Sequence, residues 1–123
     1  ISKFDKFKFE ELTVYQKSLD FVDDVYSITK KFPKDELYGL TSQYKRASVS
    51  ISLNIAEGAG DTDTQFNRYL QMAWDSSKEC VVCSTIAKRQ GFISEDDDKA
   101  ARIKLSELAK MTISLQKYLK KSK

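Results

Sequence analysis

Residues 48–60 read SVSISLNIAEGAG, and this stretch decides the fold. Small polar residues alternate there with the apolar residues Val49, Ile51, Leu53 and Ile55. A period of two with β-branched residues is typical of a half-buried strand. The same stretch also fits a helix, because apolar residues recur at spacings of three and four. This helical stripe consists of Leu40, Tyr44, Ala47, Ile51 and Ile55.

The rest of the chain favours the helical interpretation. The chain has 123 residues but only one proline and four glycines. An all-β protein of this length needs many turns, and turns depend on those two residue types. Apolar stripes with helical spacing lie on both sides of the opening stretch. We therefore predict four helices, at about residues 10–31, 40–57, 63–90 and 95–121.

The first predicted helix carries two neighbouring apolar stripes, so we expect it to bury a wide face. The first stripe consists of Leu12, Tyr15, Leu19, Val22, Tyr26 and Thr29, and the second of Val14, Phe21, Val25, Ile28 and Phe32. The helix should end at Phe32, because the residue before a proline avoids the helical region. We expect Gly58 and Gly60 to cap the second helix and to form the turn after it.

The third and fourth helices have clear start signals. Thr62 and Gln65 have the spacing of a capping box, and Ser94 precedes four acidic residues that suit a helix N-terminus. Their stripes are Phe66, Leu70, Ala73, Ser77, Cys80, Ser84 and Ala87, then Ala101, Leu105, Leu108, Thr112, Leu115 and Leu119. Short connections make neighbouring helices antiparallel. The predicted fold is all-α: an antiparallel up-and-down four-helix bundle, a single domain over residues 1–123.

Composition limits the functions open to this chain. The net charge of +3 permits contact with nucleic acid without requiring it. The chain has no histidine, which excludes a Ser–His or Cys–His catalytic pair within one chain. Cys80 and Cys83 cannot complete a zinc site alone, and their place within a helix favours core packing. We expect no enzyme activity, no metal and no cofactor, in a cytoplasmic protein without a membrane span.

Polar side chains gather on one side of the second predicted helix. They are Arg46, Ser50, Asn54 and Glu57. Partners are needed if this side is buried. The candidates on the third helix are Asp75, Ser76, Ser77 and Glu79. We predict a structural polar network of the four residues with Ser77 and Glu79 that fixes helix register. A ligand or nucleic-acid site is the alternative interpretation.

Basic residues mark two candidate phosphate contacts. Lys45 and Arg46 form a pair in the second helix, and Lys117, Lys120 and Lys121 crowd the end of the fourth. Complementing the helix dipole is the alternative role of the second group. A third basic segment alternates lysines with phenylalanines: Lys3, Phe4, Lys6, Phe7, Lys8 and Phe9. It fits either a stacking arm for nucleic acid or an extended lead-in whose phenylalanines dock on the bundle or another subunit.

Three stretches of the chain resemble a known family. They are FEELTVYQKSLDFVDDVYSITKKFP (9–33), ELYGLTSQYKRASVSISLNIAEGAG (36–60) and FNRYLQMAWDSSKE (66–79). They look like the four-helix bundle proteins encoded by intervening sequences within bacterial 23S rRNA genes. The resemblance implies a bundle that assembles as a ring-shaped homopentamer and carries no established activity with it. The accessory variability proteins of diversity-generating retroelements, a related bundle, form pentameric rings that bind nucleic acid and a reverse transcriptase.

The sequence leads to two functional hypotheses. The first is a non-enzymatic homo-oligomer that binds RNA, or an RNA-containing complex, through Lys45, Arg46 and the lysine-rich termini. A ring would repeat a weak basic patch and make it multivalent. The alternative is a protein-interaction scaffold that does not bind nucleic acid. It rests on the second apolar stripe of the first helix and on the phenylalanine-rich N-terminus.

Overall fold

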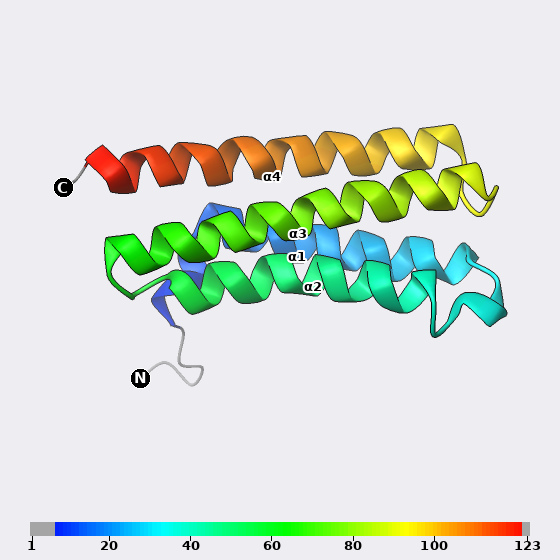
Figure 1. Ribbon diagram of the computed structural model, residues 1–123, viewed down its shortest axis with the longest axis horizontal. Coiled ribbons are helices and arrows are strands. Elements are labelled where there is room, and N and C mark those ends of the chain that lie inside the picture. Colours follow the sequence, from blue (N-terminus) through cyan, green and yellow to red (C-terminus); the bar gives the residue numbers. More distant parts are fainter. Residues whose placement is uncertain (1–6, 122–123) are drawn as a thin grey trace.

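The computed structural model describes residues 7–121, and within them every regular element is helical (Figure 1). The four long helices are α1 (Thr13–Ile28), α2 (Leu40–Gly58), α3 (Asp63–Arg89) and α4 (Glu95–Lys121). They differ from the predicted ranges by at most three residues at any end. Successive helices run in opposite directions (Figure 1). The predicted all-α, up-and-down four-helix bundle is therefore confirmed.

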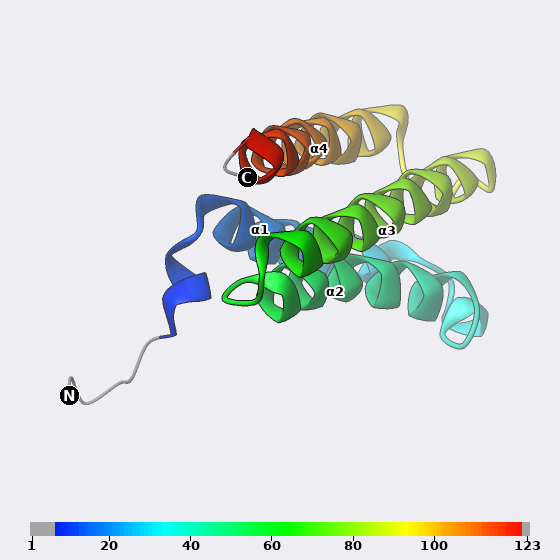
Figure 2. The same ribbon diagram turned by 60° about the vertical axis from the view of Figure 1, so that its left-hand side comes forward.

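Each helix packs against the helices next to it in sequence, and α4 returns to contact α1. The α2–α3 pair shares the largest contact and the α1–α4 pair the smallest of these four. Within residues 7–121, neither the α1–α3 nor the α2–α4 diagonal makes comparable contacts. One cluster of buried apolar residues, with members from all four helices (Figure 2), forms the core. None of the described helices is both long and apolar enough to cross a membrane.

The α2 helix resolves the ambiguity of the opening stretch. Residues 48–58 are helical, and the predicted stripe points inward, with Ile51 and Ile55 almost completely buried. Leu53, which a strand would place on the same face as Ile51, is 61% exposed. The stretch is helical and not a strand because α1 and α3 bury one face of α2. The described part of the chain contains no strand with which it could pair.

The α1 helix buries its second stripe more completely than its first, so the predicted wide buried face is only partly present: Leu12 and Tyr15 of the first stripe pack half-buried against the core, and Thr29 is buried. Phe21 and Val25 of the second stripe are buried, whereas Leu19 is 39% and Tyr26 is 45% exposed. The reason is that, among the long helices of residues 7–121, α1 packs against α2 and α4, and neither covers the side with Leu19 and Tyr26. As predicted, the helical turns stop at Phe32, whose extended backbone (ψ 149°) precedes Pro33.

Gly58 is the last residue of α2, and it serves close packing rather than a left-handed cap. An added Cβ would lie 2.7 Å from Tyr69 Cβ and 2.9 Å from Phe66 Cδ1, both on α3. The cap residue is instead Ala59, whose N–H donates to Ile55 O at 3.1 Å. The turn belongs to Gly60, whose φ of +90° favours glycine.

The start signals of α3 and α4 act as the sequence predicts. Gln65 N donates to Thr62 Oγ1 at 3.2 Å. At α4 the capping box is reciprocal, because Asp97 N donates to Ser94 Oγ at 3.0 Å and Ser94 N donates to Asp97 Oδ2 at 3.1 Å. Gly91, with φ +77°, follows the end of α3. The two caps fix where the long α3 and α4 helices begin.

The bundle interior contains many small hydroxyl residues. The predicted α3 stripe is buried, including Ser77, Cys80 and Ser84. Between α1 and α2, Ser18 Oγ and Ser52 Oγ share a buried hydrogen bond of 2.8 Å. Within residues 7–121 no buried side-chain nitrogen or oxygen lacks a hydrogen-bond partner. Small, satisfied side chains allow the helices to approach closely without a desolvation cost.

Candidate functional site

One residue on the predicted polar side of α2, Ser50, makes a side-chain hydrogen bond with α3. Asn54 Nδ2 donates to Ser50 O at 2.9 Å and to Ser50 Oγ at 3.2 Å, within α2. Ser76 Oγ on α3 donates to Ser50 Oγ at 3.0 Å. Ser77, its neighbour, is turned inward and donates to Ala73 O at 3.0 Å. The link between the helices therefore runs through Ser76, and Ser77 lies apart from it.

The three charged residues of the predicted network lie at the surface. Arg46, Glu57 and Glu79 are exposed, and within residues 7–121 none of their side chains makes a hydrogen bond or an ion pair. Arg46 and Glu79 line one hollow of about 200 Å³ between α2 and α3, together with Ser50. Because these groups are hydrated, they need no buried partner. Glu57 lies near the other end of α2, away from this hollow.

Lys45 lies beside an aromatic ring of α1. Its Nζ atom is 4.7 Å from the centre of the Tyr26 ring, within the range of a cation–π contact. Both side chains line a groove of about 450 Å³ on the α1–α2 side of the bundle. We call it the Lys45 groove. It is lined by Tyr26, Leu37, Tyr38, Thr41, Ser42, Lys45, Arg46 and Val49.

A second hollow of about 250 Å³ continues the Lys45 groove toward the α1–α2 connection. The two hollows share Tyr26, Leu37, Thr41 and Lys45. The second adds two further cations, Lys30 and Lys34. No carboxylate of the described residues lines either hollow. The combined surface therefore has four cations and no lining anion, which favours an anionic or electron-rich ligand.

The other predicted basic residues lie far from this groove. Lys117, Lys120 and Lys121 are exposed in the last turns of α4. Figure 1 shows the end of α4 at the same end of the bundle as the end of α2, whereas Lys45 and Arg46 belong to the first turns of α2. At a rise of 1.5 Å per residue, the two groups are roughly 25–30 Å apart along the bundle. The structure does not bring the predicted basic residues into one patch.

The N-terminal lysine–phenylalanine segment lies only partly within the described residues. Phe9 makes an edge-to-face contact with Tyr15 at 5.1 Å between ring centres. Phe7 stacks on Phe9 and remains 65% exposed. Phe9 thus docks on the bundle, which agrees with the lead-in interpretation for that residue. Lys3, Phe4 and Lys6 lie outside the described residues.

The two cysteines are free and buried in the core. Burial raises the pKa of the Cys83 thiol to about 11, and the nearby Glu79 charge acts in the same direction. Burial also raises the pKa of Cys80, more strongly. A protonated, buried thiol is a poor nucleophile. This agrees with the predicted packing role.

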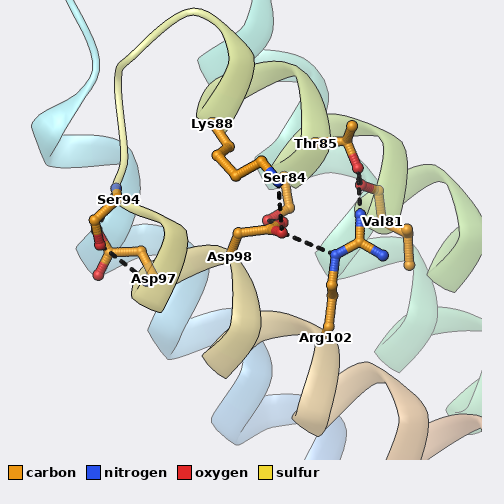
Figure 3. A network of polar contacts seen from close by, with 8 residues as sticks. All are labelled: Val81, Ser84, Thr85, Lys88, Ser94, Asp97, Asp98 and Arg102. Atoms are coloured by element: carbon orange, nitrogen blue, oxygen red, sulfur yellow. Dashed lines mark hydrogen bonds and ion pairs between the residues drawn. The ribbon is translucent and has the colours of Figure 1, made fainter.

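Asp98, in the first turn of α4, lies at the centre of a network of polar contacts (Figure 3). Its carboxylate is only 3% exposed. Ser84 Oγ on α3 donates to Asp98 Oδ1 at 2.6 Å, and Arg102 Nε donates to Asp98 Oδ2 at 2.9 Å. Lys88 Nζ lies 3.9 Å from the same oxygen. Arg102 also donates to Thr85 Oγ1 at 2.6 Å, so this network joins α3 to α4.

By sequence alone, Asp98 is one of four acids that suit the start of a helix dipole. Burial works to raise the pKa of this carboxyl, but hydrogen bonds from Ser84 and Arg102 and the charges of Arg102 and Lys88 outweigh it. The pKa therefore lies below its ordinary value of 3.8. A signal was present in the sequence, since Asp98 continues the stripe of Ala101 and Leu105 backward by three residues. The network is structural, because every group in it is already paired.

A further cavity of about 350 Å³ lies between α1 and α4. Apolar residues such as Phe21 and Ile93 line it, and the buried Tyr44 and Ser84 also border it. Two ion pairs join the helices beside it, one between Lys31 and Asp97 at 3.1 Å and one between Lys104 and Asp24. Within residues 7–121 no three His, Cys, Asp or Glu side chains are placed to hold a metal ion.

Residues 10–114 match the family model described as 23S rRNA-intervening sequence protein. The chain belongs to this family. The match covers α1, α2 and α3 in full and α4 as far as residue 114. The family resemblance predicted from the three sequence stretches is confirmed.

A solved structure shows the same architecture. It is the crystal structure of a protein of unknown function from the S23 ribosomal protein family of Bacteroides thetaiotaomicron. The TM-score is 0.78 at 22% sequence identity, and the match covers 85% of this chain and 99% of that chain. No curated protein matches this chain significantly. At this sequence identity the likeness shows the shared fold alone.

Proposed function

We propose that this family member is a non-enzymatic bundle that binds RNA through the Lys45 groove. The observation that carries the proposal is the convergence of Lys45, Arg46, Lys30 and Lys34 around two hollows that no described carboxylate lines. The phosphate backbone dominates the affinity of proteins for nucleic acids, and lysine and arginine are its usual partners. Arg46 has no competing partner among the described residues, so its guanidinium is available for a phosphate.

The lysines at the end of α4 form a separate, weaker contact in this proposal. Lys117, Lys120 and Lys121 lie near the C-terminal end of α4, where they also complement the helix dipole. A single RNA could reach both groups only by following the bundle for roughly 25–30 Å. The groove is expected to contribute more, because its cations surround a hollow.

We further propose that the protein acts as a cytoplasmic homo-oligomer, with five subunits as the resemblance implies. Large apolar side chains on the outer surface support an interface between copies. Leu53 on α2 is 61%, Val82 on α3 56% and Ile103 on α4 71% exposed, and covering such side chains would remove apolar surface from water. Repetition of the groove around a ring would raise the overall affinity for one long RNA.

Titration of a fluorescent structured RNA at increasing salt concentration tests the function. Binding should weaken steeply as salt rises. The double variant Lys45→Glu/Arg46→Glu should weaken binding at least tenfold and reduce the slope of log affinity against log salt by roughly 1.5. The variant Lys117→Glu/Lys120→Glu changes the charge equally and should have a smaller effect. Absence of binding at low salt, or binding that does not respond to salt, would overturn the proposal.

The second candidate is a scaffold that binds another protein. The same exposed apolar side chains favour it, because they also fit a different polypeptide. Affinity capture with and without nuclease separates the two functions. A partner that is retained after RNA removal, together with no salt-dependent RNA binding, supports the scaffold.

A further inference from the structure

Two tyrosines at the Lys45 groove are exposed although the backbone around them is ordered. Tyr38 is 94% exposed, in the connection between the 3-10 helix Lys34–Glu36 and α2. Backbone hydrogen bonds hold the residues before and after Tyr38. Leu37 N donates to Lys34 O at 3.2 Å, and Gly39 N donates to Glu36 O at 2.9 Å. A carboxylate oxygen of Glu36 also accepts from Leu40 N at 3.0 Å. The Tyr38 ring is therefore presented to solvent by a defined backbone.

Tyr26 provides a second ring from a different element. It comes from α1, lines the same groove as Tyr38, and is 45% exposed. Lys45 lies over its face at 4.7 Å. Leu37, which is 50% exposed, adds an apolar wall. The groove therefore combines two aromatic rings with cations.

Aromatic rings beside cations are the usual platform for unpaired nucleotides. A base in a single strand has a free face that stacks on tyrosine, whereas the bases of an A-form duplex are stacked on one another. Duplex recognition relies instead on phosphate and 2′-hydroxyl contacts across a wide shallow groove. A duplex would leave the Tyr38 ring without a stacking partner.

We infer that the Lys45 groove takes unpaired nucleotides of single-stranded RNA, with a base stacked on Tyr38. Tyr26 and Lys45 form the floor, and Arg46 and Lys34 contact the flanking phosphates. This inference rests on the proposed function, and it names the class of RNA that the same site selects. It predicts that loops, ends and bulges are bound in preference to continuous helices.

The test compares two RNAs by fluorescence anisotropy at low salt. One is a single-stranded uridine oligomer of about 12 nucleotides, and the other a blunt duplex of the same length. The single strand should bind the wild-type protein about tenfold more tightly or better. Tyr38→Ala should remove most of this preference by weakening single-strand binding about tenfold, and leave duplex binding unchanged. Tyr38→Phe keeps the ring and should retain wild-type behaviour.

Tyr118 supplies a matched control. It is 67% exposed and lies between Lys117 and Lys120 at the far end of α4. Tyr118→Ala should leave the preference for the single strand intact. Both tyrosines are exposed, so circular dichroism should show unchanged folding for each variant.

Each other result has a defined meaning. Equal affinity for both RNAs, unaffected by Tyr38→Ala, would overturn the inference and leave the proposed function standing. A loss in Tyr118→Ala equal to that in Tyr38→Ala would also overturn it, because stacking would not be specific to the groove. No binding of either RNA would overturn the proposed function and the inference together.

Discussion

The Lys45 ammonium lies 4.7 Å from the centre of the Tyr26 ring, so a cation of α2 covers an aromatic face of α1. A double-mutant cycle with Tyr26→Leu and Lys45→Met should give a coupling free energy of about 0.5–1 kcal/mol in urea unfolding. Lys78 and Trp74 on α3 offer a comparison, because Lys78 Nζ lies 5.7 Å from the centre of the Trp74 ring. Their cycle should give a smaller value because the distance is longer. A coupling near zero for Lys45 and Tyr26 would contradict this contact.

Asp98 should be essential to the joint between α3 and α4. Asp98→Asn removes the charge that accepts from Arg102, and we expect a loss of about 1.5–3 kcal/mol of unfolding free energy at pH 7. Asp96→Asn is the control, because Asp96 is an exposed acid of the same first turn. It should cost less than about 1 kcal/mol. If urea titrations showed the same loss of unfolding free energy for both variants, Asp98 would stabilise the protein only through the helix dipole.

The lowered pKa of Asp98 makes the stability of the protein depend on pH. Its pKa is lowered in the folded state, so the unfolded state binds the proton more readily. The stabilisation is therefore complete above the unfolded pKa of about 3.9 and is lost as pH falls through the folded pKa. Unfolding free energies of wild type and Asp98→Asn should converge in acid. A difference that stays constant from pH 7 down to pH 2 would be inconsistent with the role of this charge.

Gly58 should be irreplaceable for a steric reason. Alanine normally stabilises a helix relative to glycine by up to about 1 kcal/mol. At position 58, the new Cβ would meet Tyr69 and Phe66, and we expect a destabilisation of about 1–3 kcal/mol. Gly60→Ala tests backbone strain in place of steric overlap. A Cβ at position 60 would meet no atoms within 4 Å, but the backbone there has a φ of +90°. It should cost about 1–2 kcal/mol. Thermal unfolding that shows Gly58→Ala to be stabilised would refute the close α2–α3 approach.

The thiols should react only when the bundle opens. Burial raises the pKa of Cys83 to about 11, so at pH 8 the thiolate fraction is on the order of 100-fold below that of an exposed cysteine. Labelling of native protein with a thiol reagent should therefore be slow and should accelerate with urea as unfolding proceeds. Rapid labelling of one thiol in native buffer would mean that this part of α3 is accessible.

The sequence predicted the helices well, because their stop and start signals are local. Pro33, Thr62 and Ser94 act within a few residues, and local chemistry decides where those helices end or begin. The two stripes of α1 were harder to interpret. Both have helical spacing, and only the positions of α2 and α4 determine that Tyr26 faces solvent.

The site depended on contacts that spacing does not reveal. Ser76 and Ser77 are both candidate partners by sequence, and the predicted network includes Ser77, yet a rotation of about 100° per residue places Ser76 against Ser50. The Lys45 groove was predicted only in part. Lys45 and Arg46 stood out as a basic pair, but Tyr26 and Tyr38 join them through the path of the α1–α2 connection. That path is a tertiary property of residues 29–39.

Photo-crosslinking tests the central claim most directly. A single-stranded RNA containing 4-thiouridine is irradiated with the protein at low salt, and mass spectrometry identifies the attached residues. This mapping works for any oligomeric state. We predict crosslinks concentrated at Tyr26, Tyr38 and residues 41–49, which the Lys45→Glu/Arg46→Glu variant removes. Crosslinks confined to residues 117–121, or a pattern that the variant does not change, would contradict RNA binding by the Lys45 groove.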